Sequence, residues 1–257
     1  MPASAAIHAS LLLGFLLVLA RISGIFVFLP LPGLKAGPDA AKIVLALGLT
    51  IALSSRWTLT QAVPQSMVQL AGWMLIEAGI GLATGLAVAF IIETFLVAAQ
   101  AISTQAGLAY ASTVDPNTEA DSTVLLVIAQ LTAGLLFFAM GLDRQLLSIL
   151  SRSLETHPPG SFFVSRASFE GLIMLGSAVF STGLRLVLPL MTLLFLIDLS
   201  VGLLGRLNSQ LQLIALVFPL KIAVALAGLS LLALLIPRLF QQSAGMAFSA
   251  LGRLLGL

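Results

Sequence analysis

This chain has six apolar runs, and four of them carry charged residues in their interiors and not only at their ends. A charged side chain at the centre of a bilayer costs about 2.5–3.5 kcal/mol on insertion scales, so such residues face protein, water or an opposite charge. The runs cover residues 7–29, 40–53, 67–92, 124–142, 172–199 and 211–236. The interior charges are Arg21, Glu77, Arg185, Asp198 and Lys221. Only part of this molecule can therefore face lipid.

Composition assigns the chain to the membrane proteins. Of its 257 residues, 59% are hydrophobic and 9% are charged, whereas globular domains average about 25% charged residues. A helix needs about 20 apolar residues to cross the hydrocarbon core, and only the run at 40–53 is clearly short. The runs use nearly the whole chain. We therefore expect an all-α integral membrane protein with about six apolar helices paired as hairpins in a single domain, residues 1–257.

The residue types that catalysis and metal binding need are scarce and scattered. The two histidines, His8 and His157, lie far apart, and neither belongs to a His-Glu-x-x-His zinc site. No Gly-x-Ser-x-Gly nucleophile elbow is present. The chain has no cysteine, and no basic cluster carries interleaved aromatic residues. We expect no enzyme activity, no metal, no cofactor and no nucleic-acid partner.

The interior charges allow two interpretations. In the first, charges of opposite sign form ion pairs between helices and stabilise the bundle. Glu77 then pairs with Arg21, Arg185 or Lys221. In the second, some of the charges line a water-filled path. Arg185 and Lys221 each lie close to a proline, and broken helices beside charges are how transporters build ion sites at the midplane. A secondary transporter is thus an alternative that the residues leave open.

Three glycines follow Glu77 in the third run, at positions 79, 81 and 85. Gly81 and Gly85 stand four residues apart, the spacing of a small-xxx-small face on which two helix backbones approach closely. We expect these two glycines to serve helix packing.

The longest polar interruption of the chain covers residues 98–123. A stretch of small residues gives way to Thr-Val-Asp-Pro-Asn at 113–117 and then to further carboxylates, and the segment contains no Lys or Arg. Small and polar residues without basic groups can line water and move, whereas a backbone exposed to lipid must pair its own polar groups. The simpler alternative is an ordinary loop outside the cytoplasm.

A series of short motifs runs along the chain in a characteristic order. They are Phe15-x5-Arg21-x-Ser-Gly24, Pro30-x-Pro-Gly33, Glu77-x-Gly-x-Gly81, Ala106-Gly107, Asp115-Pro116, Leu184-Arg185-x3-Pro189, Asp198, Gly205-Arg206-Leu-Asn208 and Phe218-Pro219-Leu220-Lys221. Each motif is weak alone, but their order and spacing from about residue 11 to residue 236 resemble the FliR family. Its members are the flagellar type III export-gate subunits, and they have injectisome counterparts. One position departs from the family pattern, because Ser209 stands where the family usually has proline after the Arg-x-Asn element.

The resemblance implies an architecture and a set of partners. It implies a FliP-like part at 1–171, a FliQ-like helical hairpin at 172–236 and a tail at 237–257. It also implies a subunit that joins FliP-like and FliQ-like proteins, with an FlhB-like subunit nearby, in a channel for unfolded flagellar proteins. The place of such a channel is the bacterial inner membrane, in the flagellar basal body.

The resemblance further implies a role for the polar interruption. In such proteins this loop reaches into the pore as a plug, which here corresponds to residues 105–122. The residues that would form the plug are Gln105, Gly107, Tyr110, Asp115, Pro116, Asn117 and Glu119. From the residues alone an ordinary loop is the preferred interpretation, and only the resemblance reverses that preference.

Overall fold

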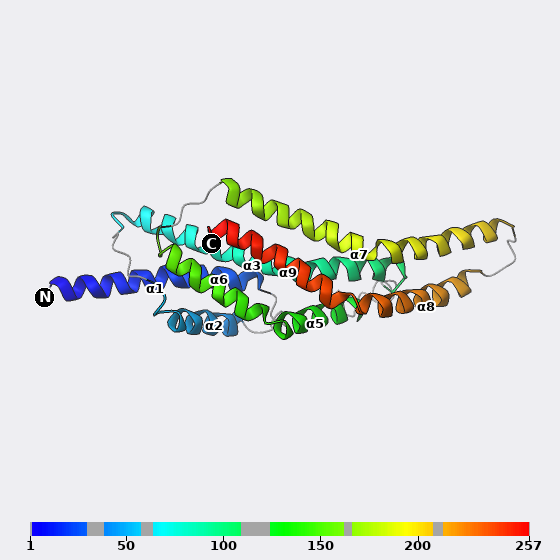
Figure 1. The fold of residues 1–257 in the computed structure, drawn as a ribbon, viewed down its shortest axis with the longest axis horizontal. Coiled ribbons are helices and arrows are strands. Elements are labelled where there is room, and N and C mark those ends of the chain that lie inside the picture. The colour runs from blue at the N-terminus through cyan, green and yellow to red at the C-terminus, as the bar shows by residue number, and fades with distance from the viewer. Residues whose placement is uncertain are drawn as a thin grey trace. The chain divides into compact units, whose positions relative to one another are not determined.

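The computed structural model describes residues 2–29, 39–57, 64–108, 124–161, 166–207 and 213–256. Within these ranges the chain forms helices and turns and no strands, which confirms the all-α prediction. The helices, shown in Figure 1, are α1 (Pro2–Phe28), α2 (Asp39–Ala52), α3 (Met67–Gln105), α5 (Val124–Ala139), α6 (Leu142–Thr156), α7 (Arg166–Leu207), α8 (Leu213–Ala233) and α9 (Ile236–Leu255).

Three of these helices contain stretches long and apolar enough to cross a membrane, namely Ser10–Phe28, Met67–Gln105 and Ile173–Arg206. Two further candidates are broken pairs, α5 with α6 and α8 with α9, each bent by 61° at its break. Counting each bent pair as one span gives five candidates in the described ranges. The apolar character of these helices confirms the membrane-protein class.

Local capping explains where α3 begins. Ser66 precedes the helix, and its hydroxyl accepts a hydrogen bond from the Gln69 backbone N–H at 3.2 Å. The Gln69 side chain reaches back and accepts from the Gln65 backbone N–H at 2.8 Å. This reciprocal arrangement resembles a capping box, in which side chains satisfy the N–H groups that the first turn leaves unpaired.

The described helices form two compact units that share long helices. One unit comprises Met1–Phe90, Phe137–Gly176 and Ala244–Leu257, and the other comprises Ile91–Leu136 and Ser177–Ser243. We call them the first and second units. In the second unit a buried cluster joins α3, α7 and α8 through Ala98, Ile102, Ala106, Val187, Leu190, Leu194 and Ala225.

Amphipathic helices complete the first unit. The buried residues of α6 recur at helical spacing, at Leu142, Leu146, Leu150, Ser153 and Leu154. The last residues of α9, Leu254 and Leu255, pack with Ile80 and Ala83 of α3. The segment expected to be a tail therefore forms a helix whose end belongs to the core of this unit.

Candidate functional site

A fully buried ion pair lies in the first unit, between α1 and α3. Arg21 Nε donates to Glu77 Oε2 at 2.5 Å, and both side chains have 0% exposure. A buried charge is tolerated only when its partner and the remaining hydrogen-bonding groups are well placed. The surroundings of the pair therefore decide whether it stabilises the chain.

The end of α6 provides acceptors for the rest of the guanidinium group. Arg21 Nη1 donates to both the carbonyl and the hydroxyl of Ser153, and Nη2 donates to the His157 carbonyl, all at 3.2 Å. The Ser153 carbonyl also accepts the backbone N–H of His157 at 2.9 Å, so Arg21 shares this carbonyl with the helix cap. The C-terminal end of a helix carries partial negative charge, so a cation there is favourable. Arg21 thus links the end of α6 to α1.

A tight turn after α6 satisfies the second oxygen of Glu77. Gly160 has a φ of +85° and follows Pro159, and the Ser161 N–H donates to the Pro158 carbonyl at 3.0 Å. Proline followed by a residue of positive φ is the pattern of a type II turn. The turn directs the Gly160 N–H onto Glu77 Oε1 at 2.8 Å. Both carboxylate oxygens therefore accept a hydrogen bond.

The same region holds the C-terminal helix. His157 Nε2 lies 2.8 Å from the carbonyl oxygen of Leu255, at the end of α9. The ion pair and its hydrogen-bond partners therefore connect α1, α3, α6 and α9. We call the group Arg21, Glu77, Ser153, His157 and Gly160 the buried polar hub.

Close contact between two helix backbones brings the ion pair together. A Cβ atom added to Gly81 of α3 would lie 1.9 Å from the Arg21 carbonyl oxygen, and one added to Gly85 would lie 2.4 Å from the Ile25 carbonyl. On α1, a Cβ on Gly24 would lie 2.5 Å from the Ala78 carbonyl. No side chain fits at these positions, since real Cβ contacts are longer than 3.0 Å. Arg21 and Glu77 lie one helical turn before Gly24 and Gly81, so the glycine crossing sets their separation.

A second charged group lies in the second unit. Lys221 Nζ of α8 is 2.7 Å from Asp198 Oδ1 of α7, and Gln105 Nε2 of α3 donates to Asp198 Oδ2 at 3.2 Å. The Asp198 side chain is 38% exposed, so this pair is more accessible than the buried polar hub. Arg185 is exposed on the surface of the chain, and it forms no ion pair with any residue that the structure describes.

Gly107 ends α3 rather than standing free in a loop. Its φ is +80°, its N–H donates to the Thr104 carbonyl at 3.2 Å, and the Leu108 N–H donates to the Ser103 carbonyl at 2.9 Å. These two bonds define a Schellman motif, which satisfies the last carbonyl groups of a helix. A Cβ on Gly107 would also lie 2.9 Å from the Phe218 ring.

The remaining residues predicted for the plug fall outside the described part of the chain. They are Tyr110, Asp115, Pro116, Asn117 and Glu119. Only Gln105 and Gly107 of that set have a described position: Gln105 is the last residue of α3, and Gly107 follows two positions later in the turn that ends the helix.

The chemistry of both charged groups is that of pairing and packing. Among the described residues, no group of three or more His, Cys, Asp or Glu side chains could hold a metal ion. Sequence reasoning singled out Arg21 and Glu77 but missed their partners on α6 and in the following turn. The Pro158-Pro159-Gly160 sequence indicates a turn at this place, but nothing in the sequence indicates that the turn donates a hydrogen bond to Glu77.

Comparison with known proteins gives one consistent family. A family model described as "Bacterial export proteins, family 1" matches residues 12–247. The chain is 32% identical to the flagellar biosynthetic protein FliR of Escherichia coli K12, over 85% of this chain and 82% of that protein. It is 29% identical to FliR of Bacillus subtilis 168 over 82% of each chain. It is 25% identical to FliR of Caulobacter vibrioides, over 85% of this chain and 86% of that protein. The chain therefore belongs to the FliR family of bacterial export proteins.

Proposed function

We propose that this chain is a non-enzymatic subunit of the flagellar type III protein export gate. It assembles with FliP-like and FliQ-like subunits, with an FlhB-like subunit as a further neighbour, and the assembly passes unfolded flagellar proteins. Its place is the bacterial inner membrane, at the flagellar basal body. Membership of the FliR family, which makes the chain a component of the flagellar export apparatus, is the observation that carries this proposal.

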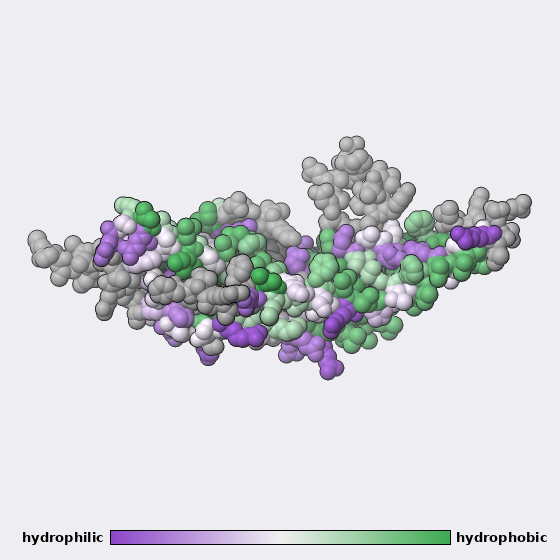
Figure 2. All heavy atoms as spheres, turned by 90° about the horizontal axis from the view of Figure 1, so that it is seen from above, coloured by the Kyte–Doolittle hydropathy of each residue, from purple (hydrophilic) through white to green (hydrophobic). Residues whose placement is uncertain are grey.

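The surface of α7 and α8 supports an assembly. Large apolar side chains are exposed along both helices, and green, apolar atoms are prominent toward the right of Figure 2, the side on which α7 ends and α8 begins in Figure 1. They include Phe180, Leu188, Leu193, Phe195, Leu196, Leu199, Leu203, Leu204, Phe218, Leu220, Leu226 and Leu231. Exposed apolar surface on this scale marks contact with lipid or with another protein. Sister subunits can cover the part that lipid does not.

The charged group of the second unit fits a hairpin built from α7 and α8. We propose that residues 172–236 form the FliQ-like hairpin, with residues 1–171 as the FliP-like part. The 2.7 Å contact between Lys221 and Asp198 joins the two helices of that hairpin. An ion pair on a partly exposed surface adds little stability, typically about 0–1 kcal/mol. Its use in the hairpin is therefore to fix how the two helices align.

Loss of the chain should abolish export. Cells that lack it should secrete no flagellar proteins into the medium, and expression of the chain should restore secretion. The measurement is immunoblotting of the culture supernatant for hook and filament proteins, with whole-cell levels as the control. Normal secretion without the chain, together with solute or ion uptake by the purified chain in liposomes, would instead favour a secondary transporter.

We propose that residues 105–122 form a plug that seals the closed gate and is displaced when an unfolded flagellar protein passes through. Deleting residues 110–119 should leave the complex assembled, because the Schellman motif that ends α3 lies before the deletion. The closed gate should then leak ions, because the segment proposed to seal it is missing. The measurement is ion or small-solute uptake by cells with normal complex levels and no exported substrate in transit. A ten-residue Gly-Ser segment in place of 110–119 separates loop length from loop identity. Unchanged permeability in both variants would return this segment to an ordinary loop.

A further inference from the structure

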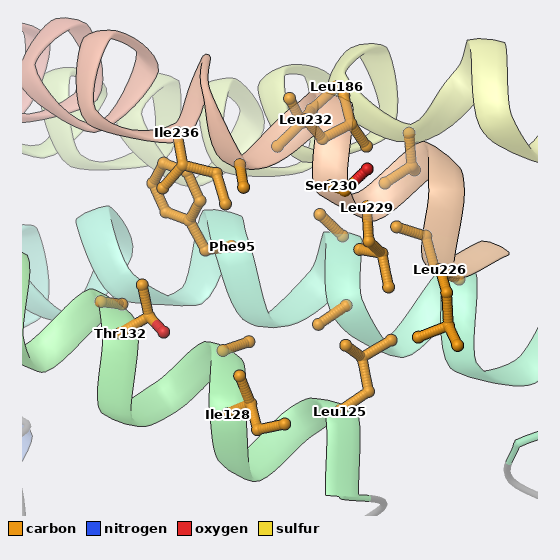
Figure 3. Close-up of a pocket in the computed structure, with 17 residues that line it drawn as sticks. Phe95, Leu125, Ile128, Thr132, Leu186, Leu226, Leu229, Ser230, Leu232 and Ile236 are labelled. Atoms are coloured by element: carbon orange, nitrogen blue, oxygen red, sulfur yellow. The ribbon is translucent and has the colours of Figure 1, made fainter.

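The second unit contains an apolar cavity of about 380 Å³. Its walls come from α3, α5, α7 and α8, with the first residue of α9 at one end. In Figure 3, Phe95 and Ile236 lie at one end of the space, and Leu125 and Leu226 lie at the other. Protein interiors are close-packed and contain few voids larger than a water molecule. A cavity of this size falls in the range of ligand pockets, about 300–1,000 Å³.

Small side chains on facing helices create the space. Five of the lining residues are alanines, which are Ala98 and Ala99 of α3, Ala129 and Ala133 of α5, and Ala233 of α8. The lining of α3 runs from Phe95 to Ile102, and a rise of 1.5 Å per residue makes that about 10 Å along the helix. The space therefore extends over two helical turns, which suits a chain-like occupant better than a compact one.

The lining offers almost nothing to a polar ligand. No charged residue lines it among those that the structure describes, and its hydroxyl groups are those of Thr132 and Ser230. The Ser230 hydroxyl already donates to the Ala227 carbonyl at 2.7 Å. Polar ligands would lose their hydrogen bonds to water here without replacement, which is unfavourable. The chemistry of the cavity therefore selects a hydrocarbon.

The mouth of the cavity opens on an apolar surface. Ile128 and Leu226 both line the cavity and remain exposed, at 54% and 59%. Beyond Ile128, the outer side of α5 continues with exposed Leu131 and Leu135. Such an apolar surface is compatible with the hydrocarbon of a bilayer, so a lipid chain can enter the opening wherever this surface faces the membrane.

We propose that this cavity binds one acyl chain of a membrane phospholipid, with the headgroup left outside. A bound acyl chain would fill the space between α3, α5, α7 and α8 and provide the van der Waals contacts that the lining side chains of an empty cavity lack. The site is independent of the export function, because it follows from the lining of the second unit alone.

Photolabelling of the full chain in its complex tests the site. The complex is reconstituted in vesicles that contain a phosphatidylethanolamine with a diazirine in one acyl chain. After illumination, modified residues are mapped by mass spectrometry. We expect labels on the α3 wall at Ala98, Ala99 and Ile102, which are only 3%, 6% and 2% exposed, as well as on Leu135 at 70% exposed. Lipid that merely surrounds the protein would label Leu135 alone.

A filling variant sharpens the test. Ala133→Phe should lower labelling of the α3 wall on the order of tenfold, because a filled interior has no room for a second occupant. Leu135→Phe, on the same helix but at an exposed position, should leave that labelling unchanged. If Ala133→Phe lowers the amount of chain in the membrane, Ala129→Leu fills the same space with a smaller side chain.

Three results would overturn the proposal. The first is an unlabelled α3 wall beside a labelled Leu135, which would show that lipid reaches the outer surface of α5 but does not enter the cavity. The second is labelling of the chain alone that disappears in the complex, which would assign the cavity to a partner subunit. The third is labelling of the α3 wall that neither filling variant reduces.

Discussion

Replacing Arg21 with methionine should lower the free energy of unfolding of the chain by about 3–5 kcal/mol, because Glu77 then stays buried without its counter-charge. The change also removes the donors to Ser153 and His157, so the end of α6 loses its tie to α1. The measurement is an SDS titration of the purified chain in mild detergent micelles. Trp73 fluorescence reports unfolding, since its ring lies against Gly160 of the buried polar hub.

A double-mutant cycle separates the charge pair from the packing of its residues. Arg21→Met combined with Glu77→Leu should recover more than half of the loss, because an apolar pair of similar volume carries no uncompensated charge. Arg185→Met makes the same change at an exposed position and should alter stability by no more than about 0.5 kcal/mol. Equal losses in the single and double variants would contradict the role of the ion pair.

Gly81→Ala should separate α1 from α3 and lower the free energy of unfolding. Overpacking typically costs about 1–3 kcal/mol, and we expect this variant to lie at the upper end of that range. The added methyl group meets the backbone of Arg21 at 1.9 Å, and a backbone cannot yield as a flexible side chain does. Because the same crossing sets the distance between Arg21 and Glu77, the variant also strains the buried polar hub. The SDS titration used for Arg21 measures the effect.

Gly79 provides the matched control on the same helix. Nothing lies within 4 Å of a Cβ added there, so Gly79→Ala should leave the free energy of unfolding unchanged or raise it by up to about 1 kcal/mol, the difference in helix propensity. If Gly79→Ala and Gly81→Ala destabilise the chain equally, helix packing at Gly81 is not the cause.

The elements that hydropathy could identify were predicted well. Each of the six apolar runs contains most of a helix, because a run of that length in a membrane protein has few alternatives to helical hydrogen bonding. α6 and α9 were not predicted as separate helices. α6 is amphipathic and carries charges on its outer face, so it gives a periodic pattern rather than an apolar run. α6 is separated from α5 at Gly141 and ends at His157. Each of these boundaries involves too few residues to change the mean hydropathy of a sequence window.

The partners of the interior charges could be predicted only in part. The sequence identified Arg21 and Glu77 as residues that need partners, but three cations could have met Glu77. The choice of Arg21 depends on the glycine crossing, which brings two helices distant in sequence into backbone contact. The acceptors at Ser153 and His157 and the donor at Gly160 are backbone groups, apart from the Ser153 hydroxyl. Backbone partners leave little trace in residue identities.

Co-purification with FliP-like and FliQ-like subunits tests the assignment of this chain to the export gate. The tagged chain is expressed in its native cells with the other export proteins at natural levels, extracted from the membrane in mild detergent and analysed by size-exclusion chromatography with mass spectrometry. We expect a single large species that contains the chain together with FliP-like and FliQ-like subunits. The Gly79→Ala variant should form it normally, and the Gly81→Ala variant should form much less of it. A monodisperse monomer that lacks both partners and moves a small solute or ion in liposomes would contradict the assignment to the export gate.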